Sequence, residues 1–588
     1  MKFLGNVIAT VVGIFIFIMM FFFGIIIIGA IFGGDKDKVS VKDNSVIELD
    51  LSKVTLDYSG KTNYKDFNYF EAHHNGVTDI LNAIEVAKTD KKIKGISILN
   101  NQSRLGLAQN KSVRDKLEEF KKTGKFVYSY SNNYTQNDYY LNSVADQVYL
   151  NPMGEVDFKG LSSEILYMKD LQEKSGVKFE VIRHGKYKSA VEPFLAQEMS
   201  PENREQMTVL LNSVWNTIVA DIAKSRKITV AQLDVIANTL GARTPELALA
   251  NKIVDKVAYE DEYHDAIRAK LKVDKKDKYN IVSVKDYAKK AVSTVNDYSK
   301  KDIIAVVYAQ GEISGGEGAV NVIGEGSIKR SLEEARKDDN VKAIVLRVNS
   351  PGGSALTSEL IWREIEITKK TKPVVVSMGN YAASGGYYIA ANADRIFAEP
   401  NTITGSIGVF GMLPNASELA KNIGINAEQV QTHDNASGYS LFEPINENFK
   451  GMVLESIEKT YDTFLKRVAD GRKMTKEQVN EIAQGRVWTG VDAHRLGLVD
   501  EIGGLEDAIK YAAKLGKTTS YRTEDFPEYE KSFEDLLANF TGMAMFKTKE
   551  QLIKEQIGEE GFQMLEQIKR VKSRKGIQAI MPFELEIH

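Results

Sequence analysis

The sequence predicts an α/β protein in which two homologous domains follow an N-terminal transmembrane helix. One observation behind this prediction is an almost unbroken apolar run near the N-terminus. The other is a group of motifs that recur at an offset of about 248 residues. These motifs lie in β-branched runs that alternate with amphipathic helices. A repeat of that kind indicates that one architecture is present twice.

Composition fits a globular protein and excludes several functions. Of the 588 residues, 27% are charged and 43% are hydrophobic, which is typical of folded domains. The 77 basic residues are balanced by 80 acidic ones, so the basic excess of a nucleic-acid-binding protein is absent and we expect no nucleic-acid partner. The chain has no cysteine, which excludes disulfides, thiol nucleophiles and thiolate metal sites. Any nucleophile must therefore carry oxygen or nitrogen.

Residues 1–34 are predicted to be a membrane anchor. From Val7 to Phe32 nearly every residue is Ile, Phe, Val, Met or Gly, and this run exceeds the roughly 20 residues that span a bilayer. The alternative is a cleaved signal peptide, whose apolar core is shorter, about 7–15 residues, and precedes small residues at a cleavage site. Charges of both signs follow the run, so its flanks leave the orientation ambiguous. Since no later segment is comparably apolar, we expect everything after about Asp35 to lie on one side of the membrane.

Three pairs of motifs define the repeats, which we expect to be domains at residues 45–300 and 301–524. Each motif is typical of a buried strand in the β-α units of a mainly parallel sheet, where ligands gather beyond the carboxyl ends of strands. The region 525–588 has no counterpart in the first repeat, and its role stays open. The pairs are Lys94-Gly-Ile-Ser-Ile-Leu with Lys342-Ala-Ile-Val-Leu-Arg, Lys125-Phe-Val-Tyr-Ser-Tyr with Lys372-Pro-Val-Val-Val-Ser, and Ala145-Asp-Gln-Val-Tyr with Ala393-Asp-Arg-Ile-Phe.

A glycine-containing turn in the second repeat is the first candidate for chemistry. Asn349-Ser-Pro-Gly-Gly-Ser follows a predicted buried strand and precedes a predicted helix from Ala355 to Lys370. Backbone N–H groups at such a turn suit a developing oxyanion, because glycine lets the acceptor approach closely and the helix dipole favours negative charge. This makes Gly353 a candidate donor, although a plain strand-to-helix turn explains the motif equally well.

Ser384 is the candidate nucleophile. The predicted strand Pro373 to Met378 runs into Gly-Asn-Tyr-Ala-Ala-Ser-Gly-Gly, so Ser384 lies among small residues. A substrate carbonyl could reach its hydroxyl and the N–H of Gly385 together. A tight packing site is the alternative. Because both crossovers consist of strand, small-residue turn and helix, we expect Gly353 and Gly385 at the same edge of the sheet.

Two candidates for the general base remain open on the residues alone. The seven histidines form no evident relay, but His433 followed by Asp434 makes a Ser/His/Asp triad conceivable, although adjacent residues do not easily contact each other as base and orienting group. The other candidate is Lys188, in Gly-Lys-Tyr-Lys-Ser-Ala-Val. A lysine has a reference pKa of about 10.4, so burial or a cationic neighbour would have to lower it. Considered alone, such a lysine is typical of a surface.

Four motifs carry a resemblance to a known family. They are Tyr187-Lys-Ser-Ala-Val-Glu-Pro-Phe, Asn349-Ser-Pro-Gly-Gly-Ser, Tyr381-Ala-Ala-Ser-Gly-Gly-Tyr-Tyr and Thr404-Gly-Ser-Ile-Gly-Val-Phe-Gly. Taken together they resemble the signal peptide peptidase A (protease IV) family in its long two-repeat form, from the anchor to about Leu515. The resemblance implies a Clp-protease/crotonase-like fold for both domains. It implies Ser384 as nucleophile, Lys188 as general base, Ser406 as a hydroxyl that hydrogen-bonds the lysine amine, and Gly353 and Gly385 as oxyanion donors.

The resemblance also implies that the dyad is split between the repeats. The first repeat has Gln136 or Asn137 where the second has Ser384, and the second has Ala436 or its neighbours where the first has Lys188. The expected enzyme is a membrane-anchored homo-oligomer, a tetramer in the family, that degrades cleaved signal peptides and other short apolar peptides without metal or cofactor. The expected location is the bacterial cytoplasmic (inner) membrane, with the catalytic body on the periplasmic side. The alternatives are a crotonase-like thioester enzyme with a coenzyme A site and a catalytically inactive peptide-binding scaffold.

Overall fold

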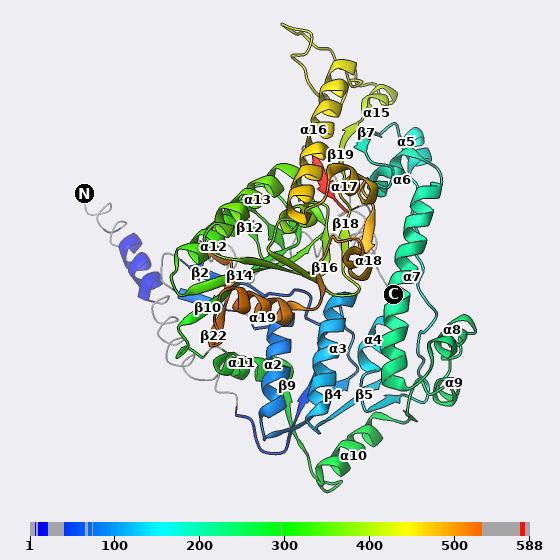
Figure 1. Ribbon diagram of the computed structural model, residues 1–588, viewed down its shortest axis with the longest axis vertical. Coiled ribbons are helices and arrows are strands. Elements are labelled where there is room, and N and C mark those ends of the chain that lie inside the picture. Colours follow the sequence, from blue (N-terminus) through cyan, green and yellow to red (C-terminus); the bar gives the residue numbers. More distant parts are fainter. Residues whose placement is uncertain are drawn as a thin grey trace. The chain divides into compact units, whose positions relative to one another are not determined.

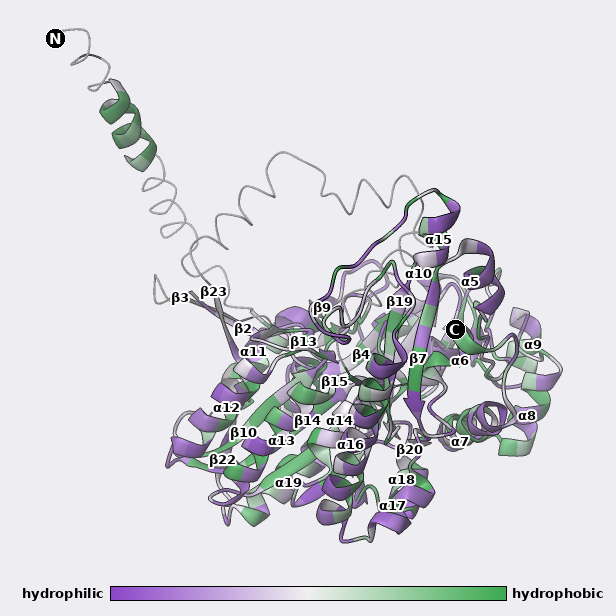
Figure 2. Cartoon of the chain, turned by 90° about the horizontal axis from the view of Figure 1, so that it is seen from above, coloured by the Kyte–Doolittle hydropathy of each residue, from purple (hydrophilic) through white to green (hydrophobic). Residues whose placement is uncertain are grey.

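The computed structural model describes residues 6, 10–20, 40–64, 69–72, 74–295, 297–531 and 577–581. The chain divides into a short N-terminal unit, Met1–Lys42, and a compact body, Asp43–His588. In the N-terminal unit, residues 10–20 form an apolar helix (Figure 2). None of the helices described is long and apolar enough to cross a membrane. Most of the predicted anchor, Val7 to Phe32, lies outside the described residues, so the anchor stays a prediction.

The first repeat forms a six-stranded sheet in the order β8-β6-β5-β4-β1-β9, and each neighbouring pair is parallel. Helices α2 and α3 lie beside strands β4 and β5 (Figure 1). The strands are β1 (Ser45–Glu48), β4 (Ile93–Leu99), β5 (Phe126–Ser131), β6 (Gln147–Leu150), β8 (Lys256–Val257) and β9 (Asn280–Ser283). The helices include α2 (Val77–Thr89), α3 (Leu107–Lys122), α4 (Gln136–Asn142), α7 (Pro201–Arg226), α8 (Val230–Asn238), α9 (Pro245–Ala250), α10 (Glu260–Leu271) and α11 (Val284–Val295).

The second repeat has the same strand order in its own parallel set, β21-β17-β16-β14-β10-β22. β18 adds to β16, and β20 pairs antiparallel with β18. The strands are β10 (Asp302–Gln310), β14 (Val341–Ser350), β16 (Val374–Ala383), β17 (Arg395–Ala398), β18 (Ile403–Gly405), β20 (Val487–Thr489), β21 (Glu501–Ile502) and β22 (Tyr521–Phe526). The helices include α12 (Glu325–Lys337), α13 (Ala355–Lys369), α14 (Gly385–Ala390), α16 (Glu447–Arg472), α17 (Lys476–Ile482), α18 (Gly490–Arg495) and α19 (Leu505–Leu515).

The internal repeat is therefore confirmed. Strands β14, β16 and β17 each begin the same number of residues after β4, β5 and β6 respectively, and both sets keep the same order in their sheets. The prediction of mainly parallel α/β sheets holds for both repeats. The domain limits stay predictions, because residues Asp43–His588 pack as a single compact unit.

Burial on both faces explains why the strands of the second sheet are so apolar. Along β10, Ile303, Ala305 and Val307 pack into the core under α12 and α13. The alternate residues Ile304 and Val306 pack into a second core with α19. Because successive side chains of a strand point to opposite faces, a parallel sheet covered by helices on both sides requires apolar residues at every position.

A third sheet crosses from one repeat to the other, and the sequence did not predict it. Its order is β12-β13-β11-β15-β24-β19-β7, and β7 pairs antiparallel with β19 along its whole length. Strand β7 belongs to the first repeat, β15 and β19 belong to the second, and β24 comes from the region beyond both. The bounds are β7 (Lys178–His184), β11 (Glu312–Ile313), β12 (Gly318–Ala319), β13 (Val322–Ile323), β15 (Gly352–Ser354), β19 (Val409–Asn415) and β24 (Gln578–Ile580).

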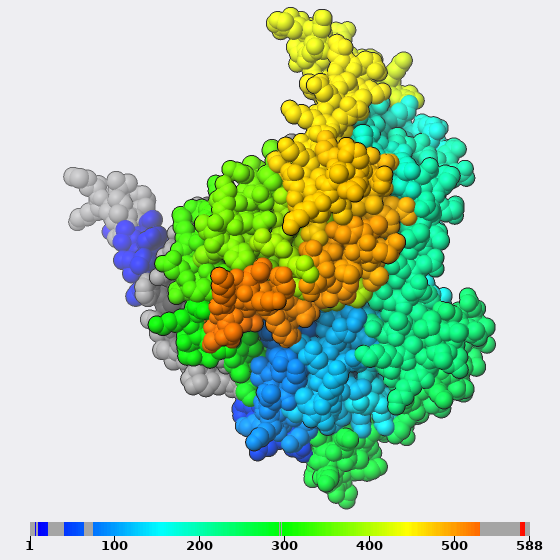
Figure 3. All heavy atoms as spheres, in the orientation of Figure 1, coloured from blue at the N-terminus to red at the C-terminus, as the bar shows by residue number. Residues whose placement is uncertain are grey.

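A small fourth sheet and a projecting segment complete the body. The fourth sheet has the order β23-β2-β3, from strands β2 (Lys61–Tyr64), β3 (Tyr69–Ala72) and β23 (Glu528–Lys531). The segment between α15 (Ser417–Asn422) and α16 stands out from the body (Figure 3). It exposes the apolar side chains Ile423, Ile425, Val430, Leu441 and Phe442.

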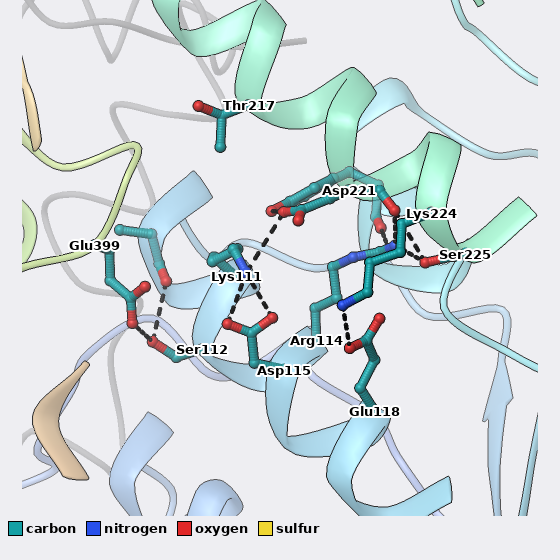
Figure 4. A network of polar contacts seen from close by, with 12 residues as sticks. Lys111, Ser112, Arg114, Asp115, Glu118, Thr217, Asp221, Lys224, Ser225 and Glu399 are labelled. Atoms are coloured by element: carbon teal, nitrogen blue, oxygen red, sulfur yellow. Dashed lines mark hydrogen bonds and ion pairs between the residues drawn. The ribbon is translucent and has the colours of Figure 1, made fainter. Parts of the chain in front are cut away.

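A polar network joins the two repeats along α3 (Figure 4). Ser112 Oγ lies 2.6 Å from Glu399 Oε1, across the boundary between the repeats. On the same helix, Lys111 Nζ lies 2.6 Å from Asp115 Oδ1 and 3.6 Å from Asp221 Oδ2. Glu399 is buried, and burial raises its pKa to about 7, with the charge of Asp115 adding to the effect and the hydrogen bond from Ser112 opposing it.

Glu399 is expected to make the stability of the protein depend on pH. Its pKa is 4.5 in an unfolded chain and about 7 in the folded one, so the folded state holds the proton more tightly. The resulting stabilisation is complete below about pH 4.5 and is lost as the pH rises through 7, for a total of about 3 kcal/mol. Glu399→Gln should remove this slope when unfolding in urea is compared at pH 5 and pH 8. The exposed Glu447→Gln should keep it, and an unchanged slope in Glu399→Gln would contradict the assignment.

Candidate active site

Ser384 lies in a strained turn between β16 and α14. Its backbone angles are φ 55° and ψ −115°, a conformation that costs a non-glycine residue free energy and recurs at functional sites. The Ser384 N–H donates to the carbonyl of Gly405 over 2.8 Å, which holds the turn. Its side chain makes no capping hydrogen bond to α14. The corresponding helix α4 has Thr135 as its N-cap, whose hydroxyl accepts from Asp138 N, and the offset of the flanking strands places Gln136 at the position of Ser384.

Lys188 follows β7 and meets two serines of the other repeat. Its Nζ lies 2.9 Å from Ser384 Oγ and 2.9 Å from Ser406 Oγ, and 3.2 Å from the carbonyl oxygen of Ser406. All three side chains are fully buried. The antiparallel pairing of β7 with β19 brings the lysine to the serines.

Burial lowers the pKa of Lys188 well below its usual value of 10.5. The cause is the loss of hydration, which disfavours the charged ammonium form. A neutral amine carries a lone pair, and at 2.9 Å it can accept the proton of the Ser384 hydroxyl. The arrangement can therefore generate a nucleophilic serine without a histidine.

The loop from Gln484 to Arg486 closes over the lysine. A Cβ on Gly485, which has φ 84°, would lie 2.6 Å from the Cβ of Lys188. The carbonyl of Gln484 accepts from the N–H of Tyr187, and the carbonyl of Arg486 accepts from the N–H of Ser406. Sequence reasoning missed this loop. The signal available was the glycine in Gln-Gly-Arg just before the short apolar strand β20.

The two glycine candidates lie in adjacent turns. Gly353 is in β15 with φ 154°, and its neighbour Gly352 has φ 102°. A Cβ on Gly352 would lie 2.8 Å from the backbone N of Gly385, and a Cβ on Gly385 would lie 2.7 Å from Ser358 Oγ. The turns thus approach too closely for side chains, and the backbone of β15 is covered here by β24, whose Ala579 pairs with Gly353.

The histidine candidate lies elsewhere. His433 is exposed, and its ring Nδ1 lies 3.0 Å from the hydroxyl of the adjacent Thr432. The side chain that Ser384 contacts is Lys188. In the part of the chain that the structure describes, no group of three or more histidine or acidic side chains could hold a metal ion.

Ser406→Gly is expected to lower kcat by roughly 10- to 100-fold while KM stays nearly unchanged. The variant removes one of the two hydroxyls that contact the amine, and glycine accepts the φ of 49° at this position without strain. Steady-state hydrolysis of a fluorogenic apolar peptide measures the two constants. A change in KM alone would show that Ser406 does not position the lysine.

An α/β fold whose buried serine hydroxyl contacts a lysine amine has the site of a serine hydrolase. The model of peptidase family S49 matches residues 119–274 and 366–519, one stretch in each repeat. The chain belongs to peptidase family S49 and is a serine protease.

Known proteins agree with this membership. The chain is 39% identical to Protease 4 of Haemophilus influenzae over 74% of its own length and 72% of that protein. It is 37% identical to Protease 4 of Salmonella typhi over 80% of its own length and 76% of that protein. Among solved structures, a mutant ClpP1 from Listeria monocytogenes matches 35% of this chain and 94% of its own, with 18% identity and a TM-score of 0.24. A likeness that weak establishes no shared fold, so the Clp-protease/crotonase-like fold stays a prediction.

Proposed function

We propose that this protease is a Ser/Lys-dyad endopeptidase in which Ser384 is the nucleophile and Lys188 the general base. The observation that carries the proposal is the 2.9 Å contact between Lys188 Nζ and Ser384 Oγ inside a fully buried site. Burial favours the neutral amine that a base requires. Ser406 holds the amine through its hydroxyl and its carbonyl oxygen.

The reaction is acyl transfer to serine followed by hydrolysis. Lys188 takes the hydroxyl proton as Ser384 Oγ attacks the peptide carbonyl, and the N–H groups of Gly353 and Gly385 stabilise the oxyanion. The lysine then gives that proton to the leaving amine. In the second half it activates the water that releases the acyl group. Neither step requires a metal or cofactor.

The proposed substrates are cleaved signal peptides and other short apolar peptides in an extended conformation. Support comes from β15, which carries Gly353 and pairs with the extended segment β24 in an antiparallel ladder, the kind of main-chain pairing by which sheets bind extended peptides. The Protease 4 relatives are bacterial. We propose that the body lies on the periplasmic side of the inner membrane, held by the segment Val7 to Phe32.

Assembly into a homo-oligomer, a tetramer in the family that the sequence resembles, is part of the proposal. The projecting segment between α15 and α16 supports it, because it exposes five large apolar side chains, including Val430 and Phe442. A segment that exposes several large apolar side chains is typical of a contact surface. The partner that binds this projecting segment would be a second copy of this chain.

The pH dependence of peptide hydrolysis tests the dyad. For wild type, kcat/KM should rise with pH as one group loses a proton, with an apparent pKa below the 10.5 of a free lysine. The value of kcat/KM rises with pH because the amine of Lys188 can accept a proton only when it is neutral. The measurement uses a quenched fluorescent signal-peptide fragment from pH 5 to pH 10, with a folded protein as the control that should resist cleavage. A rate that is flat over this range, or that falls as the pH rises, would refute the lysine as base. Wild type that is folded but inactive would favour the peptide-binding scaffold.

A further inference from the structure

A buried glutamine of the first repeat contacts both segments that carry the proposed dyad. Gln206 lies near the start of α7 and is 1% exposed. Its Oε1 accepts from the N–H of Val487 in β20 over 2.9 Å. Its Nε2 donates to the hydroxyl of Ser189 over 3.3 Å and lies 3.5 Å from the carbonyl oxygen of Tyr187. Residues 187–189, here called the lysine loop, carry Lys188 at their centre, so this side chain joins the lysine loop to the second repeat.

The strand that Gln206 contacts leads directly to the proposed nucleophile. Val487 pairs with Gly405 in the antiparallel ladder between β20 and β18. The carbonyl of Gly405 accepts from the N–H of Ser384, and the next residue, Ser406, contacts the lysine amine. Gln206 is therefore connected to the lysine loop on one side and, through one pair of strands, to the nucleophile on the other.

The start of α7 also fixes the chain that follows the lysine loop. Asn203 Nδ2 donates to Glu192 Oε2 over 2.6 Å, and Asn203 Oδ1 lies 3.5 Å from Gln206 Nε2. Glu192 Oε1 accepts from the N–H of Ser200, the N-cap of α7. These contacts join residues of the first repeat to one another, whereas the hydrogen bond to Val487 crosses to the second repeat. That hydrogen bond thus helps to determine where β20 lies against the lysine loop.

An ion pair joins the same two segments at the surface. Arg486 Nη1 lies 3.0 Å from Glu205 Oε1, and the guanidinium of Arg486 lies over the rings of Tyr187 and Trp488. The Glu205 side chain is half-exposed, and ion pairs that water reaches contribute little to holding two segments together. The buried hydrogen bonds of Gln206 are therefore the stronger connection.

A purely structural role is the simpler explanation for Gln206, because buried polar side chains are generally hydrogen-bonded. An apolar side chain would fill the same space without the cost of removing an amide from water. Packing alone therefore does not require a glutamine here, and its partners lie in the two segments that flank the dyad.

We infer that Gln206 is a positioning residue for the proposed reaction, and that it holds Lys188 Nζ within reach of Ser384 Oγ by aligning the lysine loop with β20. The inference rests on the proposed dyad. Proton transfer requires the two heavy atoms to lie about 2.6–3.2 Å apart, and they lie 2.9 Å apart. Because they belong to different repeats, a small shift of one repeat against the other changes this distance directly.

Steady-state hydrolysis of a quenched fluorescent apolar peptide by Gln206→Met tests the inference. Methionine fills nearly the same space but makes no amide hydrogen bonds. The value of kcat should fall by about 10- to 100-fold while KM stays nearly unchanged. The rise of kcat/KM with pH should also move to higher pH, because water beside a displaced lysine stabilises its charged form.

Gln136→Met is the matched control. Gln136 is also 1% exposed and hydrogen-bonds the backbone of Lys159 and Gly160, which lie in the first repeat. This variant should keep the kcat and the pH profile of wild type. An equal fall in kcat in Gln136→Met and Gln206→Met would overturn the inference, because any buried glutamine would then have the same effect.

Two further variants of Gln206 keep the test decisive if Gln206→Met folds poorly. Gln206→Asn retains the amide but is one methylene too short to reach both segments, so it should show the same fall in kcat. Gln206→Glu should be the rescue, because burial keeps its carboxyl group protonated and able to both accept and donate. Its kcat should exceed that of Gln206→Asn by at least about fivefold.

Urea unfolding of each chain separates a structural role from a positioning role. Variants that unfold at lower urea concentration but keep the kcat and pH profile of wild type would overturn the inference. A change in KM alone would also overturn it. A wild-type chain that is folded but does not hydrolyse the peptide, or whose rate does not rise with pH, would remove the proposed dyad itself.

Discussion

Ser384→Ala and Lys188→Met are each expected to reduce kcat/KM for a short apolar peptide by at least about 10³-fold. Each removes one partner of the 2.9 Å contact, and a nucleophile and its base act as a unit. For the same reason the double variant should be about as active as either single variant. Once one partner of the contact is missing, removing the other causes no further loss of rate. Activity comes from initial rates at the pH optimum of wild type.

Two control variants separate chemistry from folding. Ser331→Ala removes a buried hydroxyl of α12 that donates to the carbonyl of Ser327, far along the chain from the dyad. Lys186→Met changes an exposed lysine two residues before Lys188. Both should keep activity near that of wild type. If Lys188→Met retained activity close to wild type while Ser384→Ala lost it, another base would have to be sought.

Arg347→Met is expected to lower the free energy of unfolding by about 3–5 kcal/mol. Arg347 Nε lies 2.9 Å from Asp57 Oδ2, with the side chains 4% and 2% exposed. The arginine also donates to Ser377 Oγ and to the carbonyl of Met378. Removing it leaves the Asp57 carboxylate buried without its charged partner, and that uncompensated charge accounts for most of the cost.

The double variant Asp57→Asn/Arg347→Met should recover much of this loss, because no unpaired charge then remains. An asparagine can still accept the hydrogen bond that Gln109 Nε2 donates to Asp57. The surface pair Arg330–Glu317 supplies the matched control, and Arg330→Met should cost less than about 1 kcal/mol. Urea unfolding followed by tryptophan fluorescence measures all four chains. If Arg347→Met and Arg330→Met lowered the free energy of unfolding equally, burial would not increase the cost of breaking the Arg347–Asp57 pair.

The repeat and its strands were predictable because they rest on local patterns. Runs such as Ile344–Leu346 and Val374–Val376 are apolar at every position, which a parallel sheet covered on both faces requires. The helix predicted from Ala355 to Lys370 is α13, Ala355–Lys369. The spacing of apolar residues and their burial can be recognised from neighbouring residues in the sequence, so these elements were predictable without long-range information.

The site was only partly predictable, because its properties arise from residues distant in sequence. Nothing near Lys188 in the chain indicates that it is buried, since the contacts that bury it come from Gly408 and Gly485 in the other repeat. The resemblance to a family supplied the pairing with Ser384. The strand β24 lay in a region left without a role, and the partner of Arg347 is 290 residues away. Contacts of that range have no local signature.

On the proposed dyad, the antiparallel pairing of β7 with β19 sets the time at which the enzyme can first act. Lys188 precedes Ser384 by 196 residues, so a ribosome completes the proposed base long before it completes the proposed nucleophile. A growing chain that has emerged only as far as β9 carries the lysine with no serine to activate and no β19 to bury it. The proposed site is therefore assembled in one step late in synthesis, when β19 of the second repeat pairs with β7 of the first repeat.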